Sequence, residues 1–479
     1  MLGVITNLAR RQGGHPVDNT IARRRVRDQI ELLRDAPPLP FADLLPAETV
    51  AEALAAEGVK GRDRIFTPLI TLWTFLSQIL SPDHSCRDAV MRLISDLTVL
   101  GRPACEPSTD AYGRARQRLP LGVLQRLARE TATTLQKASP SHWLWKGRHV
   151  DLVDGTNVSM PDTPDNQKAF PQSRSQKPGC GFPVARVVAI IGLVTGAIRD
   201  LAMGPCIGKE TGETALFRGM GGVLSRGDLV LADRYFSSFF GLAGLVVRGV
   251  DVLTRMHQHR HVDFRRGRRL GVTDHIVTWE KPDRPSWMDR ATYDAMPDTI
   301  TVREVRFSVA VPGFRVHELV LATTLVDRTR YSKEDLADLY MLRWNVELDL
   351  RSIKSVMQMD VLRCKSAEMV RKEVWMHVLG YNLIRGLMAA AAEEHSTEPR
   401  HVSFQGTLQA LNAFRDELAR ASAAARPLLL AALLRSIAAQ VVGHRPDRVE
   451  PRKVKRRPKP GGHLNEPRQE ARKRLRTNK

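Results

Sequence analysis

The order of short segments rich in β-branched residues, between positions 149 and 253, constrains the fold more than any other feature of the sequence. Three predicted strands follow one another directly, and two more are each preceded by a helical stretch. The predicted strands are residues 149–153, 186–194, 197–203, 229–232 and 250–253, and the predicted helices are residues 211–224 and 236–247. This order is typical of a mixed α/β sheet.

The segments around this core have different patterns. Residues 1–145 show the apolar spacing of helices, interrupted by prolines, and predict a helical N-terminal region. Strand patterns at 275–279, 299–310 and 317–325 predict a β-rich insertion over residues 257–329. The core would thus consist of two parts, 146–256 and 330–395, followed by a helical region, 396–443, and a basic tail, 444–479.

The charge balance indicates an anionic partner. The chain has 73 Lys and Arg against 52 Asp and Glu, a net charge of +21, which favours a polyanion such as nucleic acid. The tail after residue 443 is rich in Lys, Arg, Pro and Gly, so it is expected to be disordered and to bind polyanions without sequence preference.

A second basic segment, residues 255–269, lies inside the chain. We expect it to present a basic edge to DNA phosphates, through the following arginines: Arg255, Arg265, Arg266, Arg268 and Arg269. The alternating His257, His259 and His261 could bind a metal ion, but no Cys or carboxylate set completes a site. We therefore predict no metal here.

Several classes of protein are disfavoured by what the sequence lacks. No apolar run is long enough for a membrane span, and the five cysteines form no Cys-x-x-Cys pair. The N-terminus has no apolar signal-peptide core, so a cytoplasmic location is expected. Without a Gly-x-x-x-x-Gly-Lys-Ser/Thr sequence, no nucleotide cofactor is implied.

Two aspartates directly follow predicted strands. Asp154 comes after residues 150–153, and Asp233 comes after residues 229–232. A single Asp at such a position is usually a turn or cap residue. Two of them in one sheet favour a functional site, because open α/β sheets bind ligands at the carboxyl ends of their strands.

A predicted helix after position 333 supplies a third carboxylate. At ~100° per residue, four of its side chains share an arc of roughly 60°. They are Tyr340, Arg343, Glu347 and Lys354. Asp349 is turned ~160° away from Glu347. The alternative interpretation is a salt-bridged helix, since Arg343 and Glu347 have i and i+4 spacing.

Three carboxylates from two strand ends and a helix suit a pair of hard divalent cations ~3.5–4 Å apart. Such ions activate an attacking oxygen and stabilise a leaving one. We expect two Mg²⁺ per active site, with Mn²⁺ as a substitute. Bound cations would also explain how a protein that binds polyanions tolerates acidic residues at its centre.

The motifs that carry these residues resemble a known family. Asp154-Gly-Thr, Leu231-Ala-Asp233-Arg-Tyr-Phe and the Tyr340, Arg343, Glu347, Lys354 spacing are similar to the DDE transposases of bacterial insertion sequences, of the insertion sequence 4 family. The resemblance implies a ribonuclease H-like mixed sheet with helices, interrupted by the β-rich insertion subdomain and preceded by the helical N-terminal domain. Asp154, Asp233 and Glu347 would bind the metals, and Tyr340, Arg343 and Lys354 would contact phosphates near the cleaved end.

The same resemblance implies the activity and the partners. The protein would bind the terminal inverted repeats of its element, cut double-stranded DNA and join the ends to target DNA, as a homodimer associated with the bacterial nucleoid. The helical N-terminal region would recognise the repeats by analogy. Some family members flip a base onto a tryptophan of the insertion; Trp279 and Trp287 are available, although core packing is the preferred interpretation for both.

Other functions remain open at this point. A catalytically inactive or regulatory DNA-binding protein would have the same charge, and a simple nuclease of similar fold would use the same carboxylates. A covalent tyrosine recombinase would use Tyr340 as the nucleophile and Arg343 to stabilise charge. That enzyme would form a protein–DNA adduct and would not need a metal.

Overall fold

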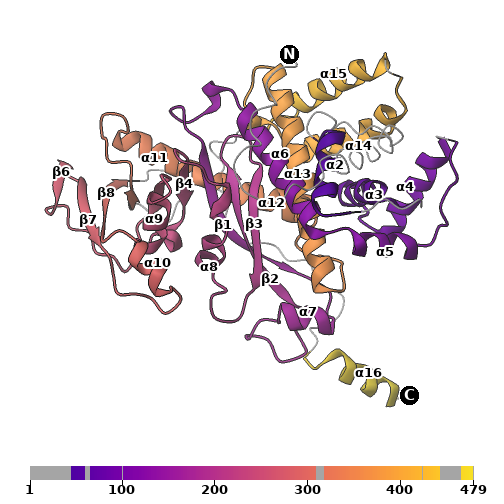
Figure 1. The fold of residues 1–479 in the computed structure, drawn as a ribbon, viewed down its shortest axis with the longest axis horizontal. Coiled ribbons are helices and arrows are strands. Elements are labelled where there is room, and N and C mark those ends of the chain that lie inside the picture. Colours follow the sequence, from indigo (N-terminus) through magenta and orange to yellow (C-terminus); the bar gives the residue numbers. More distant parts are fainter. Residues whose placement is uncertain are drawn as a thin grey trace, which may run out of the picture.

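A nine-stranded mixed sheet with helices on both faces forms the centre of the molecule (Figure 1). This computed structural model describes residues 45–59, 65–99, 101–308, 318–422, 424–442 and 465–477. The strand order is β3-β2-β1-β4-β5-β9-β8-β7-β6. The mixed α/β architecture predicted from the sequence is confirmed.

The first five strands correspond to the five predicted ones. They are β1 (Val150–Ser159), β2 (Val184–Gly192), β3 (Ile198–Pro205), β4 (Leu229–Ala232) and β5 (Asp251–Arg255). β1, β2 and β3 pair antiparallel, whereas β4 lies parallel to both β1 and β5. The carboxyl ends of β1, β4 and β5 therefore point in the same direction.

β1 is longer than the sequence predicts. Instead of ending at Val153, it continues to Ser159, because residues 154–159 pair with β2 from Ala189 to Val184. Gly155 and Thr156 resemble a turn in the sequence, but this antiparallel pairing keeps them extended. Asp154 is thus inside a strand, at the point where the parallel pairing of β1 with β4 ends.

The segment expected to form an inserted β-rich subdomain, residues 257–329, continues the same sheet. Its strands are β6 (Arg268–Gly271), β7 (Asp274–Glu280), β8 (Thr299–Ser308) and β9 (Glu318–Thr323). β9 pairs antiparallel with β5, with Leu253 opposite Thr323, and β8, β7 and β6 follow outward. One helix, α10 (Arg290–Ala295), lies between β7 and β8 in the chain.

Apolar side chains cover both faces of the parallel strands. On one face, Leu152, Leu231 and Leu253 are buried in a cluster that includes residues of α6 (Leu121–Ala138) and α13 (Ala367–Glu394). On the other face, Val153, Val230 and Val252 pack against α9 (Phe239–Val246). Burial on both faces explains why β4 is a continuous apolar run.

Helices make up the described part of the N-terminal region, as predicted. They are α2 (Ala47–Ala56), α3 (Pro68–Leu80), α4 (Cys86–Val99), α5 (Asp110–Arg118) and α6. Thr67 caps α3 by accepting a hydrogen bond from the Ile70 amide, and Pro68 occupies the first turn, where no amide donor is needed. In Figure 1 the long helix α13 lies between the sheet and α2–α5, and it packs against both α3 and α6.

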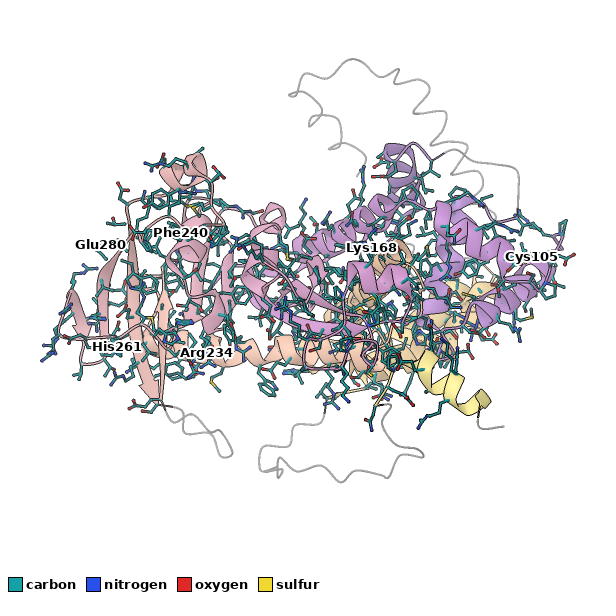
Figure 2. The ribbon with its side chains drawn as sticks, turned by 90° about the horizontal axis from the view of Figure 1, so that it is seen from below. Cys105, Lys168, Arg234, Phe240, His261 and Glu280 are labelled. Atoms are coloured by element: carbon teal, nitrogen blue, oxygen red, sulfur yellow. The ribbon has the colours of Figure 1, made fainter. Side chains whose placement is uncertain are left out.

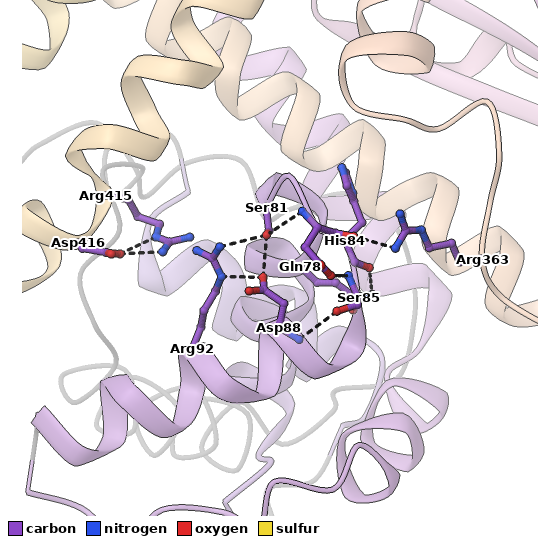
Figure 3. Close-up of polar contacts among 10 residues, drawn as sticks. Gln78, Ser81, His84, Ser85, Asp88, Arg92, Arg363, Arg415 and Asp416 are labelled. Carbon is purple, nitrogen blue, oxygen red and sulfur yellow. Dashed lines mark hydrogen bonds and ion pairs between the residues drawn. The ribbon is translucent and has the colours of Figure 1, made fainter.

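Polar contacts hold the turn between α3 and α4 against the segment that precedes α13 (Figure 3). Gln78 Nε2 donates to the carbonyl of His84 at 2.9 Å, and Ser81 Oγ donates to Asp88 Oδ2 at 2.7 Å. Arg363 Nη1 donates to the carbonyl of Asp83 at 2.8 Å. The N-terminal helices are therefore anchored to the half of the core that follows Glu347.

The C-terminal region contains α14 (Phe404–Arg420), α15 (Ala425–Ala438) and α16 (Arg468–Thr477). The expectation of a wholly disordered tail is corrected for α16, whose sequence is rich in helix formers and whose Arg474 pairs with Glu466 at 2.5 Å. The basic run at 452–459 lies outside the described residues. Within the described ranges, no helix is long and apolar enough to cross a bilayer.

Candidate active site

Asp154 and Asp233 are neighbours on adjacent parallel strands. Val153 pairs with Ala232, so the two aspartates occupy the next position on β1 and directly after β4. Asp154 Oδ1 accepts from the Gly155 amide at 2.8 Å, and Asp233 Oδ1 accepts from the Tyr235 amide at 2.8 Å. Each carboxylate uses one oxygen for a local backbone contact and keeps the other for a partner.

The third carboxylate lies on a helical segment that runs beside β1. Arg343 places Nη1 3.7 Å from Asp154 Oδ2 and Nη2 3.2 Å from Glu347 Oε1. Lys354 Nζ donates to Thr156 Oγ1 at 2.9 Å, which places this lysine beside β1 as well. The structure thus brings Asp154, Asp233 and Glu347 to one edge of the sheet, with Arg343 between the strand and the helix.

This helical segment is less regular than a single predicted helix. It consists of α11 (Lys333–Met341), the 3₁₀ turn η4 (Leu342–Trp344), α12 (Asn345–Arg351) and the π turn η5 (Ser352–Val356). A capping box formed by Ser332 and Asp335 fixes its start. Despite these changes of winding, Arg343 and Glu347 face Asp154, and Asp349 is buried on the opposite side.

The carboxylates at this edge have perturbed acidities. Burial raises the pKa of Asp154 to about 6, against the lowering effects of the Gly155 amide and Arg343, and the nearby Asp233 and Glu213 carboxylates add to the rise. Burial also raises the pKa of Glu213, which Arg186 lowers and Asp233 raises. Burial is thus the main cause of both shifts, and perturbed acidities of this kind are enriched at functional sites.

Glu213 is a residue of this site that sequence reasoning missed. It begins α8 (Glu213–Arg218), and a Cβ atom placed on Gly155 would lie 2.4 Å from its carboxyl carbon. The carboxylate therefore occupies the space directly over the residue after Asp154. A glycine inside a strand marks such a close approach, so Gly155 is the signal that could have indicated a neighbour, although not which one.

The carboxylates have the chemistry of a divalent metal site. Oxygen donors suit hard cations, and a cationic group, the Arg343 guanidinium, already lies between Asp154 and Glu347. Within the described ranges, no three His, Cys, Asp or Glu side chains converge closely enough to hold an ion in this conformation. The donor set fits divalent cations in kind, with Arg343 holding part of the space between the carboxylates.

Tyr340 is part of the same edge but is not accessible. Its side chain is buried, and burial raises its pKa to about 12, against the lowering effects of Arg343 and Arg255. Arg255 ends β5 directly beside Asp233, because Ala232 pairs with Thr254. Arg255 is the one arginine of the predicted basic segment that the fold places at the carboxylates.

The other predicted DNA-binding arginines lie farther away. Arg265 and Arg266 are largely exposed and pair with Asp263, and Arg268 and Arg269 are exposed on β6. β6 is five strands from β4, about 24 Å at ~4.8 Å per strand. In Figure 2, Arg234, which follows Asp233, and His261 of the basic segment are labelled near the same lower edge of the β-rich half.

The two tryptophans of the insertion have different surroundings. Trp279 is buried and donates Nε1 to Glu304 at 2.9 Å, in agreement with core packing. Trp287 is only partly buried and packs edge-on against Phe240. It lines a cavity of about 290 Å³ together with Phe240, and the Arg218 guanidinium lies 3.7 Å from its ring centre.

A known family model matches the region of the chain that carries this site. Residues 145–383 match the family model described as a transposase DDE domain. Transposase InsG for insertion sequence element IS4, from Escherichia coli (strain K12), is 28% identical over 429 residues, 87% of this chain and 92% of that protein. The transposase for insertion sequence element IS421 of Escherichia coli is 37% identical over 65 residues, 14% of this chain and 18% of that protein. A solved piggyBac transposase synaptic complex with hairpin DNA covers 86% of this chain and 87% of its own, with 10% identity and a TM-score of 0.43.

Proposed function

The chain belongs to the DDE transposases of bacterial insertion sequences, in the insertion sequence 4 family, and is therefore a DNA transposase; on this premise we propose that Asp154, Asp233 and Glu347 are its catalytic residues. The observation that supports the assignment most is the position of Arg343, whose guanidinium reaches both Asp154 and Glu347 beside Asp233. A strand residue and a helix residue that are far apart in sequence thus meet at one guanidinium, and Asp233 lies next to Asp154 on the neighbouring strand.

We propose that these three carboxylates hold two Mg²⁺ ions, or Mn²⁺ in their place. When bound, such ions supply Lewis-acid activation of the attacking oxygen and stabilise the leaving oxygen of the phosphodiester. The chain contributes orientation: the local amide contacts of Asp154 and Asp233 fix one oxygen of each carboxylate, and the second oxygen of Asp154 faces Arg343. A water and then the 3′-hydroxyl would attack in line, so no protein nucleophile is required.

The cationic side chains of the same edge would hold the DNA. The Arg343 guanidinium has five N–H donors, and its Nη1 and Nη2 groups face the two carboxylates, so further N–H donors remain for phosphate. Lys354 lies beside β1. Arg255 extends this basic edge next to Asp233. We propose that they contact phosphates on either side of the cleaved bond, with Tyr340 packed behind Arg343.

The exposed arginines of the basic segment would contact the same duplex farther along. Arg265, Arg266, Arg268 and Arg269 are about 24 Å from the end of β4, at ~4.8 Å for each strand of the sheet. One turn of B-DNA is about 34 Å long. A duplex that lies along the sheet would thus meet both groups within one helical turn.

The remaining features of the proposal concern assembly. The order β3-β2-β1-β4-β5, with an antiparallel trio and two parallel strands, supports a ribonuclease H-like core, extended by residues 257–329. We propose that the N-terminal helices bind terminal inverted repeats. Two such ends must meet to be joined, so a homodimer would hold them with target DNA at the nucleoid.

A covalent tyrosine recombinase is the less favourable alternative. The Tyr340 side chain is buried, and burial raises the pKa of its hydroxyl to about 12, so its ionised form is disfavoured. A nucleophile of that class must reach a phosphate. A purely regulatory DNA-binding protein is disfavoured because all three carboxylates are present at the sheet edge.

The decisive experiment is Glu347→Ala, tested on DNA that carries the ends of the element. We expect cleavage and strand transfer to fall by about 10²–10³-fold, the scale of losing a group needed in the transition state, while binding to the ends is retained. Glu334→Ala, an exposed glutamate on α11, is the matched control and should cleave normally.

Two results would refute the assignment. Retained cleavage in Glu347→Ala would exclude this residue from the chemistry. A covalent protein–DNA adduct, or cleavage that EDTA does not suppress, would instead favour the recombinase.

A further inference from the structure

Asp349 makes a buried ionic cluster on the side of α12 opposite Glu347. Its side chain is fully buried. Arg385 of α13 donates Nη2 to Asp349 Oδ1. Arg400, in the 3₁₀ turn η6 (Pro399–His401), donates Nη1 to both carboxylate oxygens at 2.7 and 2.8 Å. One carboxylate therefore binds two guanidinium groups from separate segments.

Arg400 also binds the sheet. Its Nε donates to the carbonyl of Leu193 at 2.6 Å, and its Nη2 donates to the carbonyl of Gly192 at 3.1 Å. Gly192 ends β2 and pairs with Asp151 of β1, three residues before Asp154. The Arg400 guanidinium thus connects α12 directly to the pair of strands that carries Asp154.

A tight turn closes the cluster from the side of the sheet. Gly196 has a φ of +73°, and a Cβ there would lie 2.8 Å from Arg385 Nε and 3.1 Å from Arg400 Nη1. Arg385 Nε donates in addition to the Tyr381 hydroxyl at 2.9 Å. Both guanidinium groups are held in place by neighbours other than Asp349.

Stability alone gives little reason for this arrangement, because apolar side chains of similar volume often stabilise a protein as well as a buried ion pair does. The helix has a clear need for an anchor. α12 is seven residues long and is flanked by a 3₁₀ and a π turn, so changes in hydrogen bonding border it on both sides. In the described part of the chain, Arg343 is the polar partner of Glu347, whose side chain is 40% exposed.

We propose that Asp349, Arg385 and Arg400 are positioning residues that fix the rotation of α12 on the sheet, so that Glu347 faces Asp154. This inference rests on the assignment of Glu347 as a metal-binding carboxylate. Residues that orient metal ligands from behind contribute about 10–100-fold to metal affinity. Arg400 is the best residue to change, because its side chain is 17% exposed and Asp349 keeps its bond to Arg385.

The test measures Mn²⁺ affinity of the full chain by electron paramagnetic resonance, for Arg400→Gln, Glu347→Gln and the double variant. Arg148→Gln is the matched control. Arg148 binds the Asp251 carboxylate at 2.6 Å and the Gly227 carbonyl at 2.8 Å, and its side chain is 11% exposed. It lies at the opposite end of the parallel strands, before β1.

We expect Arg400→Gln to bind Mn²⁺ about 10-fold more weakly and Arg148→Gln to bind it as the wild-type chain does. If Arg400 acts through Glu347, the double variant should bind no more weakly than Glu347→Gln alone. Wild-type affinity in Arg400→Gln, an equal loss in Arg148→Gln, or additive losses in the double variant would each overturn the proposal. Wild-type affinity in Glu347→Gln would instead refute the catalytic assignment, and the inference with it.

Discussion

At the scale of single residues, charge decides what the site can do. Asp154, Asp233, Glu213 and Glu347 lie at one sheet edge, and Arg343 reaches two of them. The chain as a whole carries a net charge of +21. A locally negative centre would repel phosphate unless cations occupied it, so metal and DNA binding at this edge are expected to reinforce each other.

Glu213 provides a test of this charge balance. We expect Glu213→Gln to weaken Mn²⁺ binding about 3–10-fold, because one negative charge next to Asp154 and Asp233 is lost. The measurement is the Mn²⁺ concentration that gives half-maximal DNA cleavage. Glu210→Gln, an exposed neighbour that pairs with Arg218, is the control. An unchanged Mn²⁺ requirement in Glu213→Gln would show that this carboxylate does not influence the ions.

At the scale of elements, the sequence pattern predicted those strands and helices whose formation depends on residues close together in the chain. β4 was predicted with its observed bounds, because four apolar residues buried on both faces leave a clear signal. The helical arc predicted that Arg343 and Glu347 share one face of the helix, and the two side chains are in contact although η4 and η5 interrupt the helix. The length of β1 and the approach of Glu213 to Gly155 depend on pairing between distant segments, which no window of sequence contains.

The turn between α3 and α4 makes stability depend on pH. His84 and His377 are buried with their rings stacked 6.2 Å apart. Burial, then His377 and Arg363, lower the pKa of His84 to about 4, against a raising effect of Asp83. Burial likewise lowers the pKa of His377. In the unfolded chain both imidazoles would titrate near pH 6.5.

Because the unfolded state then binds more protons than the folded state, stability is complete above about pH 6.5 and falls as the pH drops toward 4. We expect a loss on the order of 1 kcal/mol in the free energy of unfolding between about pH 7 and pH 5, measured by urea denaturation. His84→Asn should reduce this pH dependence, because it removes one of the two buried imidazoles. Asn is the suitable replacement because it tolerates the left-handed φ of 57° at this position. An identical pH profile in that variant would rule out His84 as a source.

At the scale of the whole molecule, one sheet joins the carboxylates to the exposed arginines. Strands β5 and β9 pair directly, so the strands that lead to Asp154 and Asp233 and the basic strand β6 belong to the same hydrogen-bonded sheet. Helices cover the faces of the parallel strands. The basic edge and the carboxylates are thus expected to keep a constant separation.

The β6 arginines should contribute to DNA affinity without sequence preference. We expect Arg268→Ala/Arg269→Ala to lower the slope of log K against log salt by about 2, because two phosphate contacts are lost at ~0.9 each. Gel-shift titrations on a random-sequence duplex at several salt concentrations measure this slope. Arg226→Ala/Arg248→Ala, two exposed arginines before β4 and β5, should leave it unchanged. A slope that is the same in both double variants would remove β6 from the DNA path.

Because the nine strands form one sheet, the number of strands between the carboxylates and β6 sets the length of DNA that the transposase is expected to contact. Neighbouring strands of a sheet are ~4.8 Å apart, which corresponds to about 1.4 base steps of ~3.4 Å each along DNA. In relatives that gain or lose a two-stranded hairpin between β5 and β6, the basic outer strand would move by two strand spacings. The protected footprint beyond the cut should change by about three base pairs with it.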